Sequence, residues 1–161
     1  MQKYNFVLIV CFSLVLGSCK IQQSNTPTKL SSTEISKEED LIKSVLTDMW
    51  DAIEKHDIDR YASHVHPDFT QFGETDSVLL VGKNAEVNAI KDYMGHSENV
   101  HTEMHEPIIT INGNIAWIVY YWSDAGLDRK IPFKTRGKST RIFVKENNKW
   151  LCIHGHYTLL P

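Results

Sequence analysis

The stretch that decides the fold runs from Ser139 to Tyr157 and reads STRIFVKENNKWLCIHGHY. Two runs rich in β-branched and aromatic residues flank Asn147-Asn148, a pair that favours a tight turn. A join this short makes the two runs antiparallel neighbours. Side-chain alternation then predicts one face of the second run, composed of Trp150, Cys152, His154 and His156. The other face is predicted to carry Leu151, Ile153 and Tyr157.

Further β-rich runs precede this hairpin. A second tight-turn signal, Asn112-Gly113-Asn114, separates the runs His101–Ile111 and Ile115–Ser123. The two runs of the hairpin described above, Lys134–Glu146 and Lys149–Thr158, complete the series. Two of the three joins are therefore short enough to force antiparallel pairing. The last third of the chain is predicted to be an antiparallel meander.

The first half of the folded region has a helical period instead. From about Glu34, apolar residues recur every three or four positions on one predicted helix face: Ile35, Leu41, Ile42, Val45, Leu46, Met49, Trp50 and Ile53. Ser36 and Glu39 form a capping-box pattern near its start.

Shorter elements are predicted between the long helix and the meander. A short helix is predicted to begin at Asp57 and to end at Pro67. A hairpin of Phe69–Phe72 and Val78–Val81 is predicted to follow it, and then a helix over Asn84–Met94. Helices followed by an antiparallel meander indicate an α+β fold. A strongly bent sheet with a long helix laid across it curls into a half-open cone that leaves room for a pocket.

The ending Trp-x-x-x-His-x-His, Trp150 to His156, and the preceding Ser139–Phe143 carry a family resemblance. They resemble the association (hub) domain of calcium/calmodulin-dependent protein kinase II and its SnoaL-like and DUF4440 relatives in the NTF2-like superfamily. The resemblance covers roughly Leu41 to Thr158. It implies a cone-shaped, cystatin-like roll, a pocket between the first helix and the bent antiparallel sheet, and assembly through the sheet's outer face. No kinase activity is implied, because the chain has no Gly-rich loop or His-Arg-Asp catalytic loop.

The N-terminus has the pattern of an export signal. Lys3 supplies a positive charge, Phe6 to Leu16 form an apolar run too short to span a bilayer, and the run ends in Leu-Gly-Ser-Cys at Cys19. This ending resembles the lipobox of bacterial lipoproteins, which implies cleavage before Cys19 and lipidation of its thiol. An ordinary secretory signal is the alternative.

We therefore expect a signal peptide at 1–18, a lipidated cysteine and flexible linker at 19–33, and a domain at 34–161. The protein is expected to be an exported lipoprotein, held by Cys19 at a periplasmic or outer-membrane face.

Composition narrows the functional classes. The chain has 161 residues, room for one ordinary domain, and a net charge of -3, which offers no basic surface for nucleic acid. If Cys11 leaves with the signal and Cys19 is acylated, only Cys152 remains in the domain, so no intrachain disulfide is expected. No motif indicates a cofactor.

Arg141 is the strongest candidate for ligand binding. It lies among apolar neighbours in mid-strand, where a guanidinium needs a partner: either an internal acid such as Glu103 or an anionic ligand. The resemblance implies an arginine-rich pocket in hub domains, where Arg141 matches one arginine and Tyr121 and Phe133 replace two others. A small-molecule ligand with an acidic or polar end and an apolar body is predicted. The predicted ligand-binding residues are Arg141, Tyr121, His154, Phe133, Trp117 and Glu103.

Two other functions remain open at this point. A small isomerase, cyclase or hydrolase would use a His/Asp pair, for which Asp68 with His64 or His66 are the candidates. A pure oligomerisation module would fill the cavity with its own side chains. Histidine pairs such as His101 and His105 are scattered over several elements, whereas zinc needs three or four converging ligands, so no metal site is predicted.

Aromatic residues occupy both predicted faces of one strand. Trp117 and Tyr121 share one face, and Tyr120 and Trp122 share the other. A sheet with one face in water would not normally carry large aromatics on both sides. We therefore expect one face to line the cone and the other to be covered in a homodimer or larger homo-oligomer.

Overall fold

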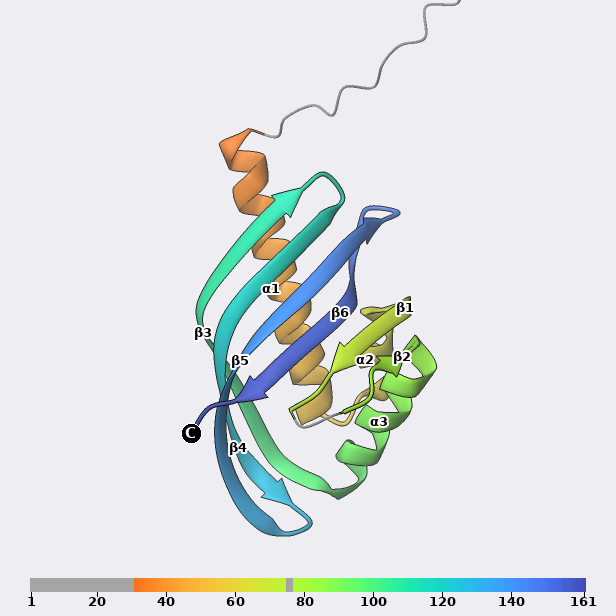
Figure 1. The fold of residues 1–161 in the computed structure, drawn as a ribbon, viewed down its shortest axis with the longest axis vertical. Helices are drawn as coiled ribbons and strands as arrows, with labels where there is room; N and C mark the ends of the chain where they lie inside the picture. Colours follow the sequence, from red (N-terminus) through yellow and green to blue (C-terminus); the bar gives the residue numbers. More distant parts are fainter. Residues whose placement is uncertain (1–30, 75–76) are drawn as a thin grey trace, which may run out of the picture.

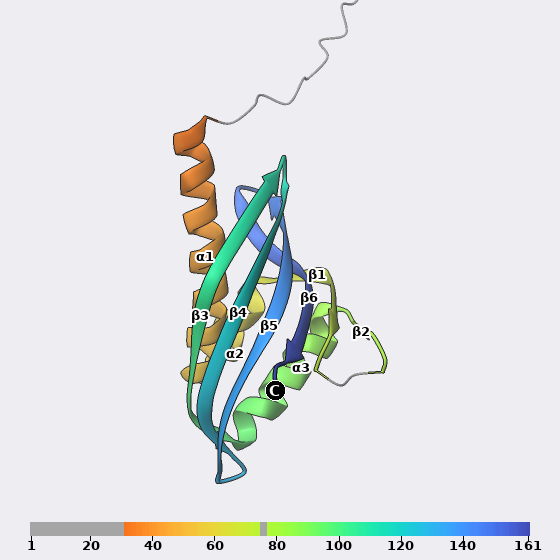
Figure 2. The ribbon, with the colours of Figure 1, turned by 60° about the vertical axis from the view of Figure 1, so that its left-hand side comes forward.

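The structure is a computed structural model that describes residues 31–74 and 77–161. The predicted signal peptide, Cys19 and most of the linker lie outside the described residues. Within them, three helices and six strands form one α+β unit, with the helices gathered on one side of a bent sheet (Figures 1 and 2). None of the described helices combines the length and apolar character needed to cross a bilayer.

The sheet has the strand order β2-β1-β6-β5-β4-β3. The four long strands β3 (Ser97–Asn112), β4 (Ile115–Asp128), β5 (Ile131–Glu146) and β6 (Lys149–Leu159) pair antiparallel in sequence order, as predicted. Strands β1 (Val65–Phe72) and β2 (Leu80–Val81) form the predicted hairpin at the edge. Strand β1 pairs with β6 in parallel, so the sheet is not antiparallel throughout. This long-range pairing has no turn signal in the sequence.

Tight turns join the long strands. Asn147 and Asn148 both have positive φ, and Gly113 has φ of 62°, as their turn chemistry predicts. The β4–β5 hairpin continues well beyond the predicted ends of its strands and turns at Arg129 and Lys130, which also have positive φ. Long cationic side chains are not a turn signal, so this extension was missed.

Helix α1 (Ser32–Glu54) crosses the concave side of the sheet. Its buried face contains Ile42, Leu46, Met49 and Ala52. The helix starts two residues earlier than predicted, and the capping box is formed by Ser31 and Glu34, so the assignment to Ser36 and Glu39 was wrong. Ser31 Oγ accepts from the Glu34 amide, and the Glu34 carboxylate accepts from the Ser31 amide at 2.8 Å.

Two carboxylates attach the two halves of α1 to the sheet. Glu38 accepts hydrogen bonds from Lys145 Nζ at 2.5 Å and Trp150 Nε1 at 2.6 Å, and the Lys145 bond lowers the pKa of Glu38. Near the other end, Glu54 accepts from the Thr102 amide of β3 at 2.8 Å. These contacts set the position of the helix along the strands.

The two shorter helices lie beside the long helix, at one end of the helical layer. Helix α2 (Ile58–Ser63) is capped by Asp57 as predicted, but it ends before β1 begins, so Pro67 lies inside β1 and does not terminate the helix. Helix α3 (Lys83–His96) packs against β1 and contacts α1 and α2.

The two faces of β4 differ sharply in burial. Ala116, Ile118 and Tyr120 point inward and are buried, whereas Trp117 and Tyr121 point outward and are 38% and 48% exposed. The inward residues join the α1 face and Phe143 in one core. The predicted division of the aromatic residues between two faces is confirmed.

A bulge in β6 reverses its side-chain alternation. Ile142 pairs with His154 while Phe143 pairs with Cys152, so Ile153 is an extra residue in β6. Trp150 and Cys152 point inward as a pair, but beyond Ile153 the inward positions are Gly155 and Tyr157. The prediction that His154 and His156 share the face of Trp150 was therefore wrong, because strict alternation holds only without a bulge.

Gly137 provides the first test of this packing. A Cβ at Gly137 would lie 2.4 Å from the Trp122 ring and 2.7 Å from the Thr158 carbonyl oxygen, which belongs to the backbone of β6 and cannot rotate away. We expect Gly137→Ala to lower the free energy of unfolding by about 1–3 kcal/mol, measured by urea denaturation. Gly95→Ala in α3 is the control: it meets nothing within 4 Å and should raise stability by roughly 0.5–1 kcal/mol. Equal effects of the two substitutions would contradict the packing at Gly137.

Candidate functional site

A cavity of about 360 Å³ lies between helices α1 and α3 and the concave face of the sheet. Apolar side chains of α1 and α3, including Met49, Ile53 and Ile90, form one wall. Aromatic side chains of the strands, including Tyr120 and Trp122, form the opposite wall. A cavity of this size with an apolar lining and a few polar groups is the ordinary form of a small-molecule site.

Arg141 lies on the sheet wall of this cavity. Its Nη1 donates to Gln71 Oε1 at 2.8 Å, and its guanidinium lies 6.0 Å from the centroid of the Tyr157 ring. Its Nε–H is buried and has no hydrogen-bond partner among the described residues. A buried donor without a partner carries a desolvation cost, which a ligand acceptor would remove.

Gly155 allows Arg141 to reach Gln71. The register places Arg141 of β5 beside Gly155 of β6, and Gly155 beside Gln71 of β1. The guanidinium crosses over the intervening strand, because a Cβ at Gly155 would lie 2.4 Å from Arg141 Nη1. The parallel pairing of β1 with β6 is what supplies Gln71 as a partner.

A buried carboxylate, that of Glu86, balances part of the positive charge of Arg141. Glu86 of α3 is 1% exposed and accepts from the Tyr61 hydroxyl at 2.5 Å and from Gln71 Nε2 at 3.4 Å. Burial and the nearby Glu86 raise the pKa of Tyr61 well above its usual value, so Tyr61 stays a neutral donor. Gln71 thus connects Arg141 to Glu86.

Asp124 lines another part of the cavity, further along β4. It accepts a hydrogen bond from the Thr135 hydroxyl, and burial raises the pKa of its carboxyl. Tyr93 of α3 lies nearby, and burial together with Asp124 and Asp128 raises its pKa to about 12. The sequence offered no signal for Asp124, Glu86 or Gln71, because their burial depends on long-range packing.

The predicted ligand-binding residues are divided between the two faces of the sheet. Arg141 lines the cavity, whereas Tyr121 and Trp117 lie on the outer face. His154 also lies on the outer face, where its Nδ1 is 2.8 Å from Thr70 Oγ1, and burial and Arg141 lower its pKa. Phe133 is half-buried near the start of β5 and does not line the cavity.

Glu103 does not pair with Arg141. Its side chain is 59% exposed on β3 and lies 3.8 Å from His101 Nε2. The internal pairing proposed as one alternative is therefore not formed with this residue. Glu86, acting through Gln71, takes that place.

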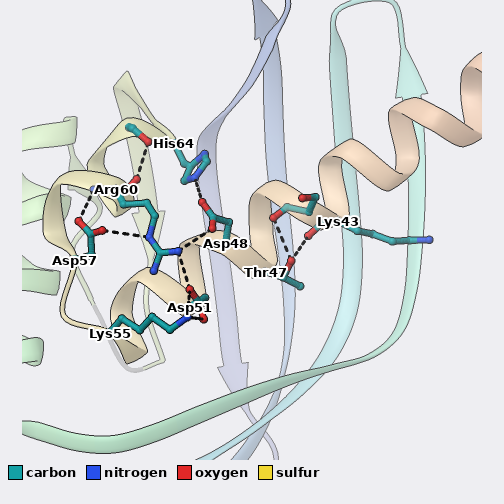
Figure 3. Close-up of polar contacts among 10 residues, drawn as sticks. Lys43, Thr47, Asp48, Asp51, Lys55, Asp57, Arg60 and His64 are labelled. Atoms are coloured by element: carbon teal, nitrogen blue, oxygen red, sulfur yellow. Dashed lines mark hydrogen bonds and ion pairs between the residues drawn. The ribbon is translucent and has the colours of Figure 1, made fainter.

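The candidate His/Asp residues lie outside the cavity. His64 Nε2 is 2.6 Å from Asp48 Oδ2, and Asp48 also contacts Arg60, which binds Asp51 and Asp57 (Figure 3). These contacts connect α1 to α2 and to His64, the residue just before β1.

Asp68 and His66 are joined through a backbone group. The Asp68 amide donates to His66 Nδ1 at 3.0 Å, while His66 Nε2 lies 3.4 Å from Glu146. Neither residue lines the cavity. In residues 31–74 and 77–161, no three His, Cys, Asp or Glu side chains are grouped to hold a metal ion.

A second hollow, of about 630 Å³, lies on the outer face of the sheet. Ile108, Val119, Tyr121, Lys138 and His156 line it. Ile108 is 66% exposed, and with Trp117 it extends an apolar surface along β3 and β4.

Comparison with known proteins agrees with this architecture. The SnoaL-like domain family matches residues 42–160. The chain belongs to the SnoaL-like family. The solved association domain of calcium/calmodulin-dependent protein kinase II from Caenorhabditis elegans superposes with a TM-score of 0.65 at 25% identity, covering 80% of this chain and 99% of that domain. The predicted fold and superfamily are confirmed.

Other relatives extend the comparison. A protein of the NTF2-like family from Streptomyces avermitilis has a TM-score of 0.73 at 12% identity, covering 79% of this SnoaL-like chain and 99% of the other. In sequence, the C. elegans kinase itself is 27% identical over 147 residues, which is 90% of this chain and 20% of the kinase. The chain thus spans about a fifth of the curated relative's length, and the likeness concerns the association region.

Proposed function

We propose that this protein is a membrane-tethered SnoaL-like domain that binds a small acidic molecule in its cavity and associates with itself through the outer face of the sheet. The observation that carries ligand binding is the buried, unpartnered Nε–H of Arg141 on the wall of an apolar cavity. A carboxylate there would accept a charge-assisted hydrogen bond, which is stronger than a neutral one. The apolar lining would hold the rest of the molecule.

Self-association is supported by a separate observation. Ile108, Trp117, Val119 and Tyr121 form an exposed apolar strip on the outer face of β3 and β4. Contiguous exposed apolar surface of this kind marks interaction sites on soluble domains. Two solved relatives, one named as an association domain and one named as a hub, have the same fold, which favours a second copy of the chain as the partner.

The ligand proposal is tested with octanoate, which has a carboxylate and an apolar body. We expect octanoate to bind the purified full-length chain in isothermal titration calorimetry and octanamide to bind at least about tenfold more weakly, because only the carboxylate gains the charged hydrogen bond. Arg141→Met should remove this preference, and Lys138→Met on the outer face should leave it intact.

Thermal melting checks that each variant of this pair is folded. If Arg141→Met is unfolded, the comparison of octanoate with octanamide on the unsubstituted protein is by itself the test of carboxylate binding. Equal affinity for the two compounds would contradict the role of Arg141.

Self-association is tested by size-exclusion chromatography with light scattering. We expect a dimer or larger assembly at micromolar concentration, and we expect Tyr121→Glu to shift it towards monomer by placing a charge in an apolar interface. Lys91→Glu, which introduces the same residue on the exposed side of α3, should not. A monomeric unsubstituted protein would refute the proposal.

The membrane tether is tested through the cysteines. In a bacterial host, we expect the protein to fractionate with membranes and to carry an acyl-modified Cys19, detected by mass spectrometry. Cys19→Ser should lose the modification and the membrane attachment, since multiple acyl chains provide the binding energy. Cys11→Ser, a change within the predicted signal, should retain both. Membrane attachment of Cys19→Ser would contradict the proposed anchor.

A further inference from the structure

The cavity is lined by more acidic than basic side chains among the described residues. Arg141 is its single cationic side chain among the described residues, whereas Glu74, Glu86 and Asp124 are acids. Glu86 is already bound by Tyr61 and linked through Gln71 to Arg141. Asp124, which accepts from Thr135, lies outside this connected group of Arg141, Gln71, Glu86 and Tyr61.

Arg141 and Asp124 mark two separated ends. Arg141 pairs with Ile118 of β4, and Asp124 lies six residues further along the same strand, with the same inward parity. Six residues of extended strand span roughly 20 Å at about 3.3 Å per residue, and the bend of the sheet shortens the direct path. The Arg141 side chain extends across β6 towards Gln71 of β1, away from β4, so it does not close the gap to Asp124. The two groups cannot bind the same atom of a small ligand.

Asp124 has no positively charged partner among residues 31–74 and 77–161. Its carboxylate accepts from Thr135, and no ion pair reaches it from any described residue. The side chains around this end of the cavity include Tyr93 of α3, Trp122 of β4 and the acidic Glu74. Burial makes the ionised carboxylate costly, so a cationic group beside it would be favourable.

The walls between the two ends also suit a cation and an apolar chain. Trp50 packs edge-on against Tyr120, and Trp122 packs edge-on against Tyr157, so aromatic rings line the passage. Organic ammonium groups are attracted to aromatic faces. The aliphatic side chains Leu46 and Met49 of α1 cover the opposite side.

We propose that the cavity binds an elongated molecule with two charged ends, an α,ω-amino carboxylate, whose carboxylate contacts Arg141 and whose ammonium contacts Asp124. The inference rests on the proposed function, in which Arg141 holds an acidic group, and adds the recognition of the opposite end. Neither charge of the ligand then stays unpaired in the cavity. A ligand with a methyl group in place of the ammonium would leave Asp124 without a counter-charge.

The test compares matched compounds by titration calorimetry of the full-length chain. The probes are ω-amino carboxylates of six, eight, ten and twelve carbons, each beside the plain carboxylate of equal length. At the best length we expect the amino carboxylate to bind at least about tenfold more tightly, although its terminal group is more polar than a methyl group.

Single substitutions test recognition of the ammonium end of the ligand separately from recognition of its carboxylate end. Asp124→Asn should reduce the affinity for the amino carboxylate to that for the plain carboxylate, whose own binding should not change. Asp92→Asn, which alters an exposed acid on α3, should leave both unchanged. The comparison of paired compounds on the unchanged protein does not depend on the folding of any variant.

The outcomes are distinct. If plain carboxylates bind as tightly as amino carboxylates at every length, the two-ended ligand is refuted while the role of Arg141 stands. If no carboxylate of either kind binds, the proposed function fails and this inference fails with it. If 1-aminooctane binds as tightly as the best amino carboxylate, the carboxylate end is refuted.

Discussion

The packing of α1 against the concave face of the sheet is the interaction on which the rest of the structure depends. Ile42, Leu46 and Met49 are almost completely buried against inward side chains of β4 and β5. Each fully buried side chain of this size contributes about 1.5–3 kcal/mol of transfer free energy. The same contact creates the cavity, because the helix covers a bent surface that it does not fill. Glu38 and Glu54 hold the helix in place along the strands.

The cavity wall shows why a charged side chain is tolerated inside this fold. A buried guanidinium is costly unless its donors are satisfied. Gly155 and the parallel β1 strand let Arg141 reach Gln71, and Gln71 in turn donates a hydrogen bond to Glu86. The buried Nε–H, for which the described residues offer no hydrogen-bond partner, is therefore the feature that gives the cavity its proposed chemistry.

The two faces of the sheet have different environments and, on our proposals, different roles. The bulge at Ile153 moves His154 and His156 to the outer face, beside Thr70 and the apolar strip. The inner face keeps Arg141 and the aromatic rings of the cavity. A single strand such as β4 thus contributes Tyr120 to the proposed ligand site and Tyr121 to the proposed interface.

The sequence by itself determined the long helix, the four-stranded meander and the fold class. The period of the Ile35–Ile53 segment and the Asn-rich turns depend on residues near one another in the chain, so α1 and the β3–β6 meander followed from pattern alone. Arg141 was predicted as a site residue for the same reason, since a cation between apolar neighbours is visible locally, and the structure places it on the cavity wall. Only the tertiary structure decided the parallel pairing of β1 with β6, the bulge at Ile153, and the burial of Gln71, Glu86 and Asp124. These features arise where segments distant in sequence meet, and strand alternation or helix period carries no information about which distant side chain a buried group will face.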